Sequence, residues 1–385
     1  MSKTGTLSRL IPVLVGFFIM GFCDIVGIAT SYVKVDFNLN ETMAGLIPSM
    51  VFVWFLLLSL PAALLMNKLG RKRMVIISDV ITFVGMLLPF FAYNLTICLT
   101  AFILLGIGNT ILQVSLNPLV NNIVKGKSLT SALTAGQVVK AVSSFCGPLL
   151  AAFVTLYIGE WQYLFPIYAI LTLISALWLT FTQIPHEDKQ EPTTIAQTLS
   201  LLGNSKIIML FLGIFFIVGT DVGLNTVAPK LLIERCAFTV SDAGIGSSVY
   251  FFCRTAGAFI GAIILGHVSA IKYFRLNILA ALLTMVALFY LNTTLTVMIA
   301  LGLLGFFCSS IFSIIFAQAL VAAPSKENEL SGLMIMGVCG GAVIPPIMGY
   351  LTDLLHSQIG SLLAIGGCLI YLTYCSMALK TKKDI

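Results

Sequence analysis

Five ionisable side chains lie inside long apolar stretches of the sequence: Asp24, Asp79, Lys140, Asp221 and Arg254. A charge at the centre of a bilayer costs about 2.5–3.5 kcal/mol on insertion scales, so such residues usually face a partner or a water-filled cavity. Asp24 shares a helical face with Gly27 and Ser31, and its carboxylate is a candidate for binding and releasing a cation. A permanent ion pair between helices is the other interpretation. For Asp79 we expect a structural or snorkelling role.

A stripe of amides follows the helical period in the fourth apolar stretch, with one amide every four residues: Asn109, Gln113 and Asn117. Amides on one helix face can bind the hydroxyl groups of a solute. They can also hydrogen-bond a neighbouring helix and so hold a helix bundle together. We favour solute contact and keep the structural interpretation open.

Lys140 lies on one helical face with Gln137 and Ser144. A buried ammonium must be neutral, paired or bound to an anion. Lys140 therefore either forms an ion pair with Asp24 or binds an anionic group of a solute. The two interpretations remain open, and Gln137 is a further candidate for solute contact.

The second half of the chain carries a similar group of polar residues. Asp221 lies one helical turn before Asn225, while Ser247, Tyr250 and Arg254 share a face of the next apolar stretch. Arg254 is either a structural partner of Asp221 or a solute contact. Tyr250 can provide an aromatic wall for a ring-shaped solute, and Asn225 can provide a hydrogen bond.

The composition requires that helices in a membrane position these side chains. The chain has 385 residues, of which 59% are hydrophobic and 9% charged, with a mean hydropathy of +1.05. Soluble domains carry roughly 25% charged residues, so a water-soluble globule is excluded. A spanning helix needs about 20 mostly apolar residues. Twelve such stretches predict an all-α polytopic membrane protein: 10–33, 43–66, 74–93, 97–122, 130–157, 163–183, 206–229, 243–267, 274–292, 296–321, 331–353 and 359–379.

The net charge of +6 is explained by basic residues that collect on one side of the membrane, and it does not indicate nucleic-acid binding. With a cytoplasmic N-terminus, only Lys34, Lys230 and Arg235 face the opposite side. This asymmetry predicts that both termini are cytoplasmic in a bacterial inner membrane. The basic residues then on the cytoplasmic side are Lys68, Arg71, Lys72, Arg73, Lys125, Lys127, Lys272, Arg275, Lys326, Lys380, Lys382 and Lys383.

Neither the cysteines nor the loops carry a pattern typical of an enzyme. The nine cysteines are scattered, without a CxxC pair or metal-ligand spacing. The loops hold no nucleotide-binding motif and no nucleophile–base constellation. We therefore expect no enzyme, no cofactor and no metal site.

A polar loop from Gln183 to Ser200 divides the sequence into halves that resemble each other at an offset of about 197 residues. This pattern predicts two parallel-repeated six-helix bundles, residues 1–182 and 201–385, joined by a cytoplasmic central loop at 183–200. In such a design the solute site lies between the bundles near mid-depth. The matching positions are Asp24 with Asp221, Ala44-Gly45 with Ala243-Gly244, and Pro148 with Pro345 or Pro346.

Several segments resemble known transporters. "NKLGRKR" (67–73) is similar to the GxxxDRxGR(R/K) loop signature of the major facilitator superfamily, with Ala63 and Asn67 replacing its first glycine and its aspartate. The chain further resembles the fucose–hexose–proton symporter family. That resemblance is carried by "AGLIPSMVFVWFLLLSLPAALLMNKLG" (44–70), "SLNPLV" (115–120), "GQVVKAVSSFCGPLLA" (136–151) and "SGLMIMGVCGGAVIPPIMGYLTD" (331–353).

The resemblance implies a monomeric importer of a monosaccharide or sugar derivative, driven by H⁺ or Na⁺ symport. The implied sugar contacts are Asn109, Gln113, Asn117, Gln137, Asn225, Tyr250 and Arg254, with Asp24, Lys140 and Asp221 linked to the coupling ion. Two acidic positions of the family hold non-acidic residues in this chain. The helix-one aspartate falls at Gly27, one turn from Asp24, and the helix-four glutamate is Gln113, which cannot titrate.

Two other functions remain open from the sequence. An exporter of drugs or metabolites by proton antiport would have a more apolar cavity, which the amide stripes disfavour. A membrane sensor that binds a solute without moving it is disfavoured because the loops are too short to hold a signalling domain.

Overall fold

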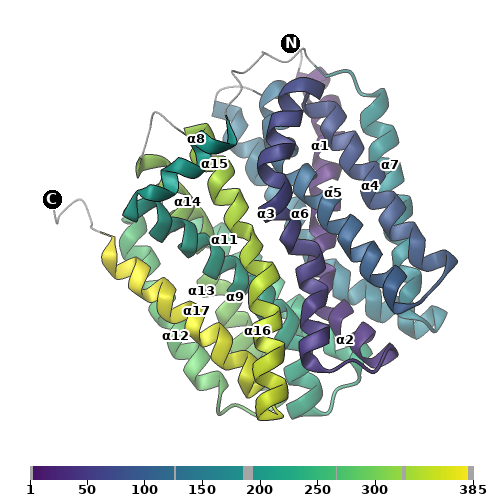
Figure 1. The fold of residues 1–385 in the computed structure, drawn as a ribbon, viewed down its shortest axis with the longest axis vertical. Helices are drawn as coiled ribbons and strands as arrows, with labels where there is room; N and C mark the ends of the chain where they lie inside the picture. Colours follow the sequence, from purple (N-terminus) through teal and green to yellow (C-terminus); the bar gives the residue numbers. More distant parts are fainter. Residues whose placement is uncertain (1–2, 125–126, 185–193, 266, 323–326, 380–385) are drawn as a thin grey trace. The chain divides into compact units, whose positions relative to one another are not determined.

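The computed structural model describes residues 3–124, 127–184, 194–265, 267–322 and 327–379. These residues form helices joined by short turns, with no strand among them (Figure 1). Within this described part, twelve helical stretches are long and apolar enough to cross a membrane, which confirms the twelve predicted spans. Half of the predicted central loop at 183–200, namely residues 185–193, lies outside the described part of the chain.

Two compact units make up the chain. The first contains residues 1–25 and 54–195, and the second contains residues 26–53 and 196–385. The chain thus passes from one unit to the other inside its first and second spans. The division into bundles 1–182 and 201–385 concerns the repeated halves of the sequence and stays a prediction.

The first unit is built around α4, which packs against α5 and α7, while α1 packs against α5 and α6. Gly108 of α5 allows close packing, because a Cβ there would lie 2.1 Å from Thr82 Oγ1 of α4. The elements of this unit are α1 (Lys3–Met20), η1 (Gly21–Ile25), the second part of α3 (Glu41–Leu69), α4 (Arg71–Phe91), α5 (Leu95–Ile123), α6 (Lys127–Ile158), η2 (Trp161–Tyr163) and α7 (Leu164–Phe181).

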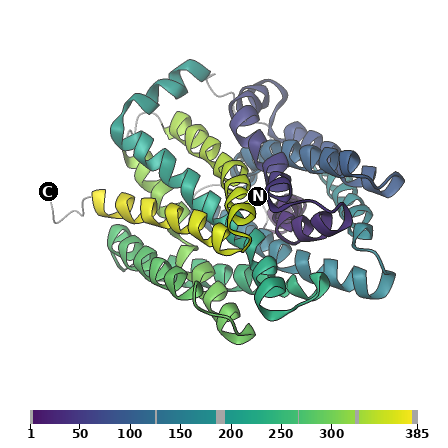
Figure 2. The same cartoon turned by 60° about the horizontal axis from the view of Figure 1, so that its bottom comes forward.

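The second unit is built around α9, which packs against α2, α11, α16 and α17. The helices α16 and α17, yellow-green and yellow in Figures 1 and 2, also pack against each other. The elements are α2 (Val26–Asp36), the first part of α3, α8 (Ile195–Ser200), η3 (Leu201–Gly203), α9 (Ser205–Cys236), α10 (Val240–Ala243), α11 (Ile245–Leu265), α12 (Ala270–Leu288), α13 (Thr294–Cys308), α14 (Ile311–Ala322), α15 (Glu327–Met336), η5 (Gly337–Cys339), α16 (Gly340–Leu355) and α17 (Ile359–Ala378).

The basic turn between α3 and α4 is tight. Gly70 adopts φ 87°, a left-handed value at which glycine has no Cβ penalty. Arg71 Nη1 donates to the Pro118 carbonyl of α5 at 2.9 Å. The turn is thereby fixed to the end of α5.

One capping contact occurs in both halves of the sequence. Lys72, at the start of α4, donates to the Thr180 and Thr182 carbonyls at the end of α7, both at 2.8 Å. Arg275, near the start of α12, donates to the Ser376 and Leu379 carbonyls at the end of α17, at 2.9 and 2.6 Å. Basic side chains stabilise the unpaired carbonyls of a helix C-terminus. The same contact therefore recurs in the two halves of the sequence, and the internal repeat stays a prediction.

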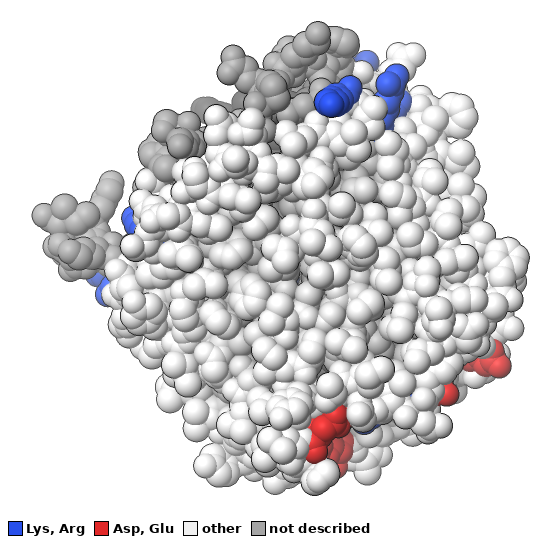
Figure 3. Space-filling model, viewed as in Figure 1, with Lys and Arg blue, Asp and Glu red and all other residues white. Residues whose placement is uncertain are grey.

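The outer surface suits a lipid environment. Large apolar side chains such as Phe91, Phe181 and Tyr290 are exposed, as expected where lipid replaces water. Figure 3 shows basic side chains at the end of the first unit where α3 meets α4. Among the described residues of that unit, the exposed acid is Glu160, at the α6–α7 turn. Charges therefore mark the ends of the helices.

Candidate functional site

The first span is broken in the middle. The helix α1 ends at Met20, the five residues Gly21–Ile25 form a 3₁₀ turn, and α2 begins at Val26. Gly21 permits close contact with α6, because a Cβ at this position would lie 2.6 Å from Ser143 Cβ and 2.8 Å from the Lys140 carbonyl. A 3₁₀ stretch inside a helix often marks a functional hinge. The break is also where the chain passes from the first unit to the second.

Asp24 lies inside this break and is half-buried. Its carboxylate accepts hydrogen bonds from the Ser144 hydroxyl of α6 and from the Cys23 thiol. Asp24 also lies two residues before Val26, the first residue of α2, and a helix N-terminus favours negative charge nearby. In transporters, discontinuous helices of this kind commonly form sites for a substrate or a coupling ion.

The amide stripe on α5 begins in the core and ends at the surface. Asn109 is only 1% exposed, and its Nδ2 donates to the Met20 carbonyl at 2.9 Å. Gln113 Nε2 donates to Asn109 Oδ1 at 2.8 Å. Gln113 is half-buried, while Asn117 is exposed. Asn109 therefore binds the backbone where α1 ends, which is the structural interpretation of the stripe, and Gln113 and Asn117 have more accessible side chains.

The polar face of α6 lies at the helix break. The Ser144 hydroxyl that donates to Asp24 also donates to the Lys140 carbonyl, at 3.1 Å. Lys140 is half-buried and Gln137, almost one turn earlier, is exposed. Ion pairs among the described residues include Lys34–Glu41, Lys230–Glu41 and Arg254–Asp221. The pairing of Lys140 with Asp24 stays a prediction, as does its binding of a solute anion.

The second unit joins Asp221 of α9 to two side chains of α11. Arg254 Nε lies 2.8 Å from Asp221 Oδ1, and the Tyr250 hydroxyl donates to the same oxygen. The pairing of Arg254 with Asp221 is thereby confirmed. Tyr250 is fully buried, whereas the side chains of Arg254 and Asp221 are 32% and 22% exposed. The charged groups of Arg254 and Asp221 are therefore accessible to water or to a solute.

Asn225 is 2% exposed and packs against α2 within the second unit. A Cβ on Gly27 would lie 2.1 Å from Asn225 Oδ1. A carboxylate at position 27, where the family resemblance places one, has no room unless Asn225 moves. Asp24, one turn earlier, instead contacts α6 of the first unit.

Asp79 of α4 has a fully buried side chain in the first unit, beside Ser175 of α7. Its position among α4, α5 and α7 agrees with the structural role expected from the sequence. In the described part of the chain, no group of three or more His, Cys, Asp or Glu side chains is placed to hold a metal ion.

Comparison with known families decides the class of protein. The model of the Major Facilitator Superfamily matches residues 13–346. This chain belongs to the Major Facilitator Superfamily. It is accordingly a multi-pass membrane protein of a transporter family and not an enzyme.

Individual relatives are similar over nearly the whole chain. A Helicobacter pylori protein named "Putative glucose/galactose transporter" is 27% identical, covering 98% of each chain. A Brucella abortus "Glucose/galactose transporter" is 25% identical, covering 93% of this chain and 90% of the relative. The crystal structure of the Escherichia coli fucose:proton symporter FucP superposes with a TM-score of 0.70 at 17% identity, covering 98% of this chain and 100% of that one.

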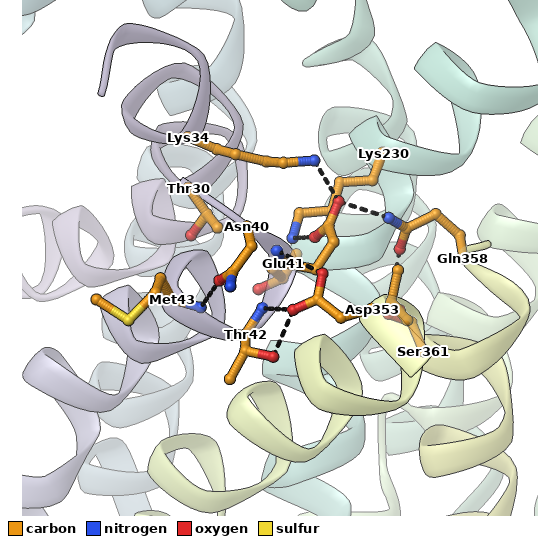
Figure 4. Close-up of polar contacts among 12 residues, drawn as sticks. Thr30, Lys34, Asn40, Glu41, Thr42, Met43, Lys230, Asp353, Gln358 and Ser361 are labelled. Carbon is orange, nitrogen blue, oxygen red and sulfur yellow. Dashed lines mark hydrogen bonds and ion pairs between the residues drawn. The ribbon is translucent and has the colours of Figure 1, made fainter. Parts of the chain in front are cut away.

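Sequence reasoning missed a charged cluster in the second unit (Figure 4). Glu41, at the start of α3, binds Lys34, Lys230 and Gln358, while Asp353 of α16 binds the backbone of Glu41 and Thr42. The sequence showed these charges only at the ends of apolar stretches, where topology alone explains them. A pattern that could have identified the cluster is the opposite charge of Lys34 and Glu41, which flank one short turn.

Proposed function

We propose that this chain imports a monosaccharide or sugar derivative by cation symport, with H⁺ as the first candidate and Na⁺ as the second. The observation that carries the proposal is Asp24 in the broken first span, bonded to Ser144 on the polar face of α6. A carboxylate among polar side chains in a discontinuous helix suits an ion that must bind and leave. The names of the glucose/galactose relatives support a sugar as the solute.

The proposed sugar contacts come from both halves of the sequence. Gln113, Asn117 and Gln137 offer accessible or half-buried amides. Arg254 and Asp221 form a partly exposed pair that can exchange its internal contacts for sugar hydroxyls. We also keep Asn109, Asn225 and Tyr250 as proposed contacts, although their side chains are buried in this conformation.

The cellular setting is part of the same proposal. The protein resides as a monomer in the bacterial inner membrane with both termini in the cytoplasm, as the distribution of Lys and Arg predicts. The basic turn at Arg71–Arg73 then lies on the cytoplasmic side, and the turn between α2 and α3 lies on the outer side.

A thermal-shift screen of the purified protein tests the solute class. The panel contains glucose, galactose and fucose, together with sugar acids and acylated sugars, because Lys140 is a candidate anion contact. A ligand at 100 times its Kd stabilises the folded state by about 2.7 kcal/mol. A rise in melting temperature with one or more sugars is expected, and the Gln137→Ala variant should need more ligand for the same shift. A panel without any shift, beside shifts from apolar drugs, would favour the exporter and contradict the proposal.

A further inference from the structure

Asp353 caps a helix that is distant in the sequence. The Glu41 and Thr42 backbone N–H groups, at the start of α3, donate to Asp353 Oδ1 and Oδ2 at 2.9 and 2.8 Å. The first N–H groups of a helix lack partners within it, and a carboxylate there also interacts favourably with the helix dipole. The side chain of Asn40, the local cap, accepts from Met43 N at 2.8 Å. The carboxylate of α16 thus completes the cap of α3.

Glu41 makes a second set of contacts from the same helix end. Its two carboxylate oxygens bind Lys34 Nζ at 2.5 Å and Lys230 Nζ at 2.6 Å, and Gln358 Nε2 donates to it at 2.9 Å. Figure 4 shows these side chains converging on Glu41 from α2, α9 and the turn before α17. Lys230 is 8% exposed, so its charge depends on Glu41, whereas Lys34 is partly open to water.

Next to this cluster, the backbones of α3 and α16 pack closely against each other. A Cβ on Gly45 would lie 2.5 Å from the Pro345 carbonyl, and a Cβ on Gly349 would lie 2.3 Å from the Glu41 carbonyl. One turn after Gly45, the Ser49 hydroxyl donates to the Ala342 carbonyl. Small residues at these positions let the two helices approach closely, and they leave no room for a solute along this seam.

We infer that Lys34, Glu41, Lys230, Asp353 and Gln358 form an outer latch, which holds residues 26–53 against α9, α16 and α17 and must open before a solute enters from the side of the α2–α3 turn. The inference rests on the proposed function, since only a transporter needs this side to open. Charged hydrogen bonds suit such a latch, because water can replace them when the helices separate. The latch would set how often the outer side opens.

The rate of thiol alkylation at the seam tests the latch without any solute. Ser49→Cys places a thiol at a buried position of α3, and every protein in the series carries this substitution. The purified full chain in detergent is treated with a maleimide, and the modified position is read by mass spectrometry. We expect Glu41→Gln and Asp353→Asn each to raise the rate at position 49 at least tenfold. Glu160→Gln, an exposed acid at the α6–α7 turn, is the matched control and should leave the rate unchanged.

Labelling of Cys98, which is fully buried in the first unit, distinguishes opening of the latch from unfolding of the protein. Protection of Cys98 together with faster labelling at position 49 supports the latch. If a single variant exposes Cys98, the double variant Glu41→Gln/Lys230→Gln replaces it, because removing both charges leaves no buried charge stranded, while Lys34 is partly open to water. Labelling at position 49 within twofold of the parent in the folded variants would overturn the latch. Sugar uptake plays no part in this readout, so a failure of the proposed solute would not alter the result.

Discussion

Asp24 and Asp221 occupy matching positions in the two sequence repeats, yet the structure gives them different surroundings. Asp24 lies in a 3₁₀ break and accepts from the hydroxyl of Ser144. Asp221 lies inside the continuous helix α9, forms an ion pair with Arg254 and accepts a hydrogen bond from the Tyr250 hydroxyl. Two acids at positions that the sequence predicts to match therefore have different surroundings. We propose that Asp24 exchanges the coupling cation, whereas Arg254 compensates the charge of Asp221 in this structure and the predicted coupling role of Asp221 stays a prediction.

The Asp221–Arg254 pair gives the largest expected effect on stability. Each of Asp221→Asn and Arg254→Gln leaves one charge without its partner, which costs about 3–5 kcal/mol when the pair is fully buried. Since both side chains are partly exposed, we expect a loss of about 2–3 kcal/mol in each single variant. The double variant should lose less than the sum, and a double-mutant cycle of unfolding free energies measures this coupling. A coupling energy near zero between Asp221 and Arg254 would mean that Arg254 does not compensate the charge of Asp221. It would contradict the proposed difference between Asp221 and Asp24.

Alanine variants of Gln137 and Asn225 compare the two halves of the sequence by their effect on sugar affinity. Gln137 is exposed on α6, so Gln137→Ala should remove one hydrogen bond to the sugar, worth about 0.5–1.5 kcal/mol, and weaken affinity roughly threefold to tenfold. Asn225 packs on Gly27, so Asn225→Ala should lower the melting temperature as well as the affinity. Isothermal titration and thermal unfolding measure both quantities. Unchanged affinity in both variants would move the sugar site elsewhere.

Asn109 gives the smallest expected effect. Asn109→Ala removes the hydrogen bond to the Met20 carbonyl and leaves Gln113 Nε2 without that acceptor, which should cost about 1 kcal/mol. Asn117→Ala, on the same helix but exposed, is the matched control and should leave stability unchanged. Equal stability losses in the two variants would show that the break in the first span does not depend on Asn109.

Hydropathy and charge were sufficient to predict the twelve spans, because lipid imposes a fixed length on each helix. Helical spacing also placed Asp24, Gln137 and Ser144 among the candidate polar residues, and it offered the pairing of Asp221 with Arg254 as one of two interpretations. These features depend on local sequence. They could therefore be predicted without a structure.

The break in the first span and the outer latch could not be predicted in the same way. Residues 21–25 are as apolar as their surroundings apart from Asp24, and the break depends on contacts of Gly21 with α6. The latch joins Glu41 to Asp353, which is 312 residues away. Contacts over such separations depend on how the helices pack, and a single sequence carries no periodic signal for them.

Uphill accumulation of a labelled sugar by the Asp24→Asn variant tests the central claim most directly. Purified protein in liposomes is given an inward proton gradient, or an inward sodium gradient, and the labelled sugar is glucose or galactose. The account predicts that the parent protein concentrates the sugar, and that Asp24→Asn only equilibrates it while still exchanging internal for external sugar. Glu160→Gln should behave as the parent. Accumulation by Asp24→Asn at the level of the parent would contradict the assignment of cation coupling to Asp24.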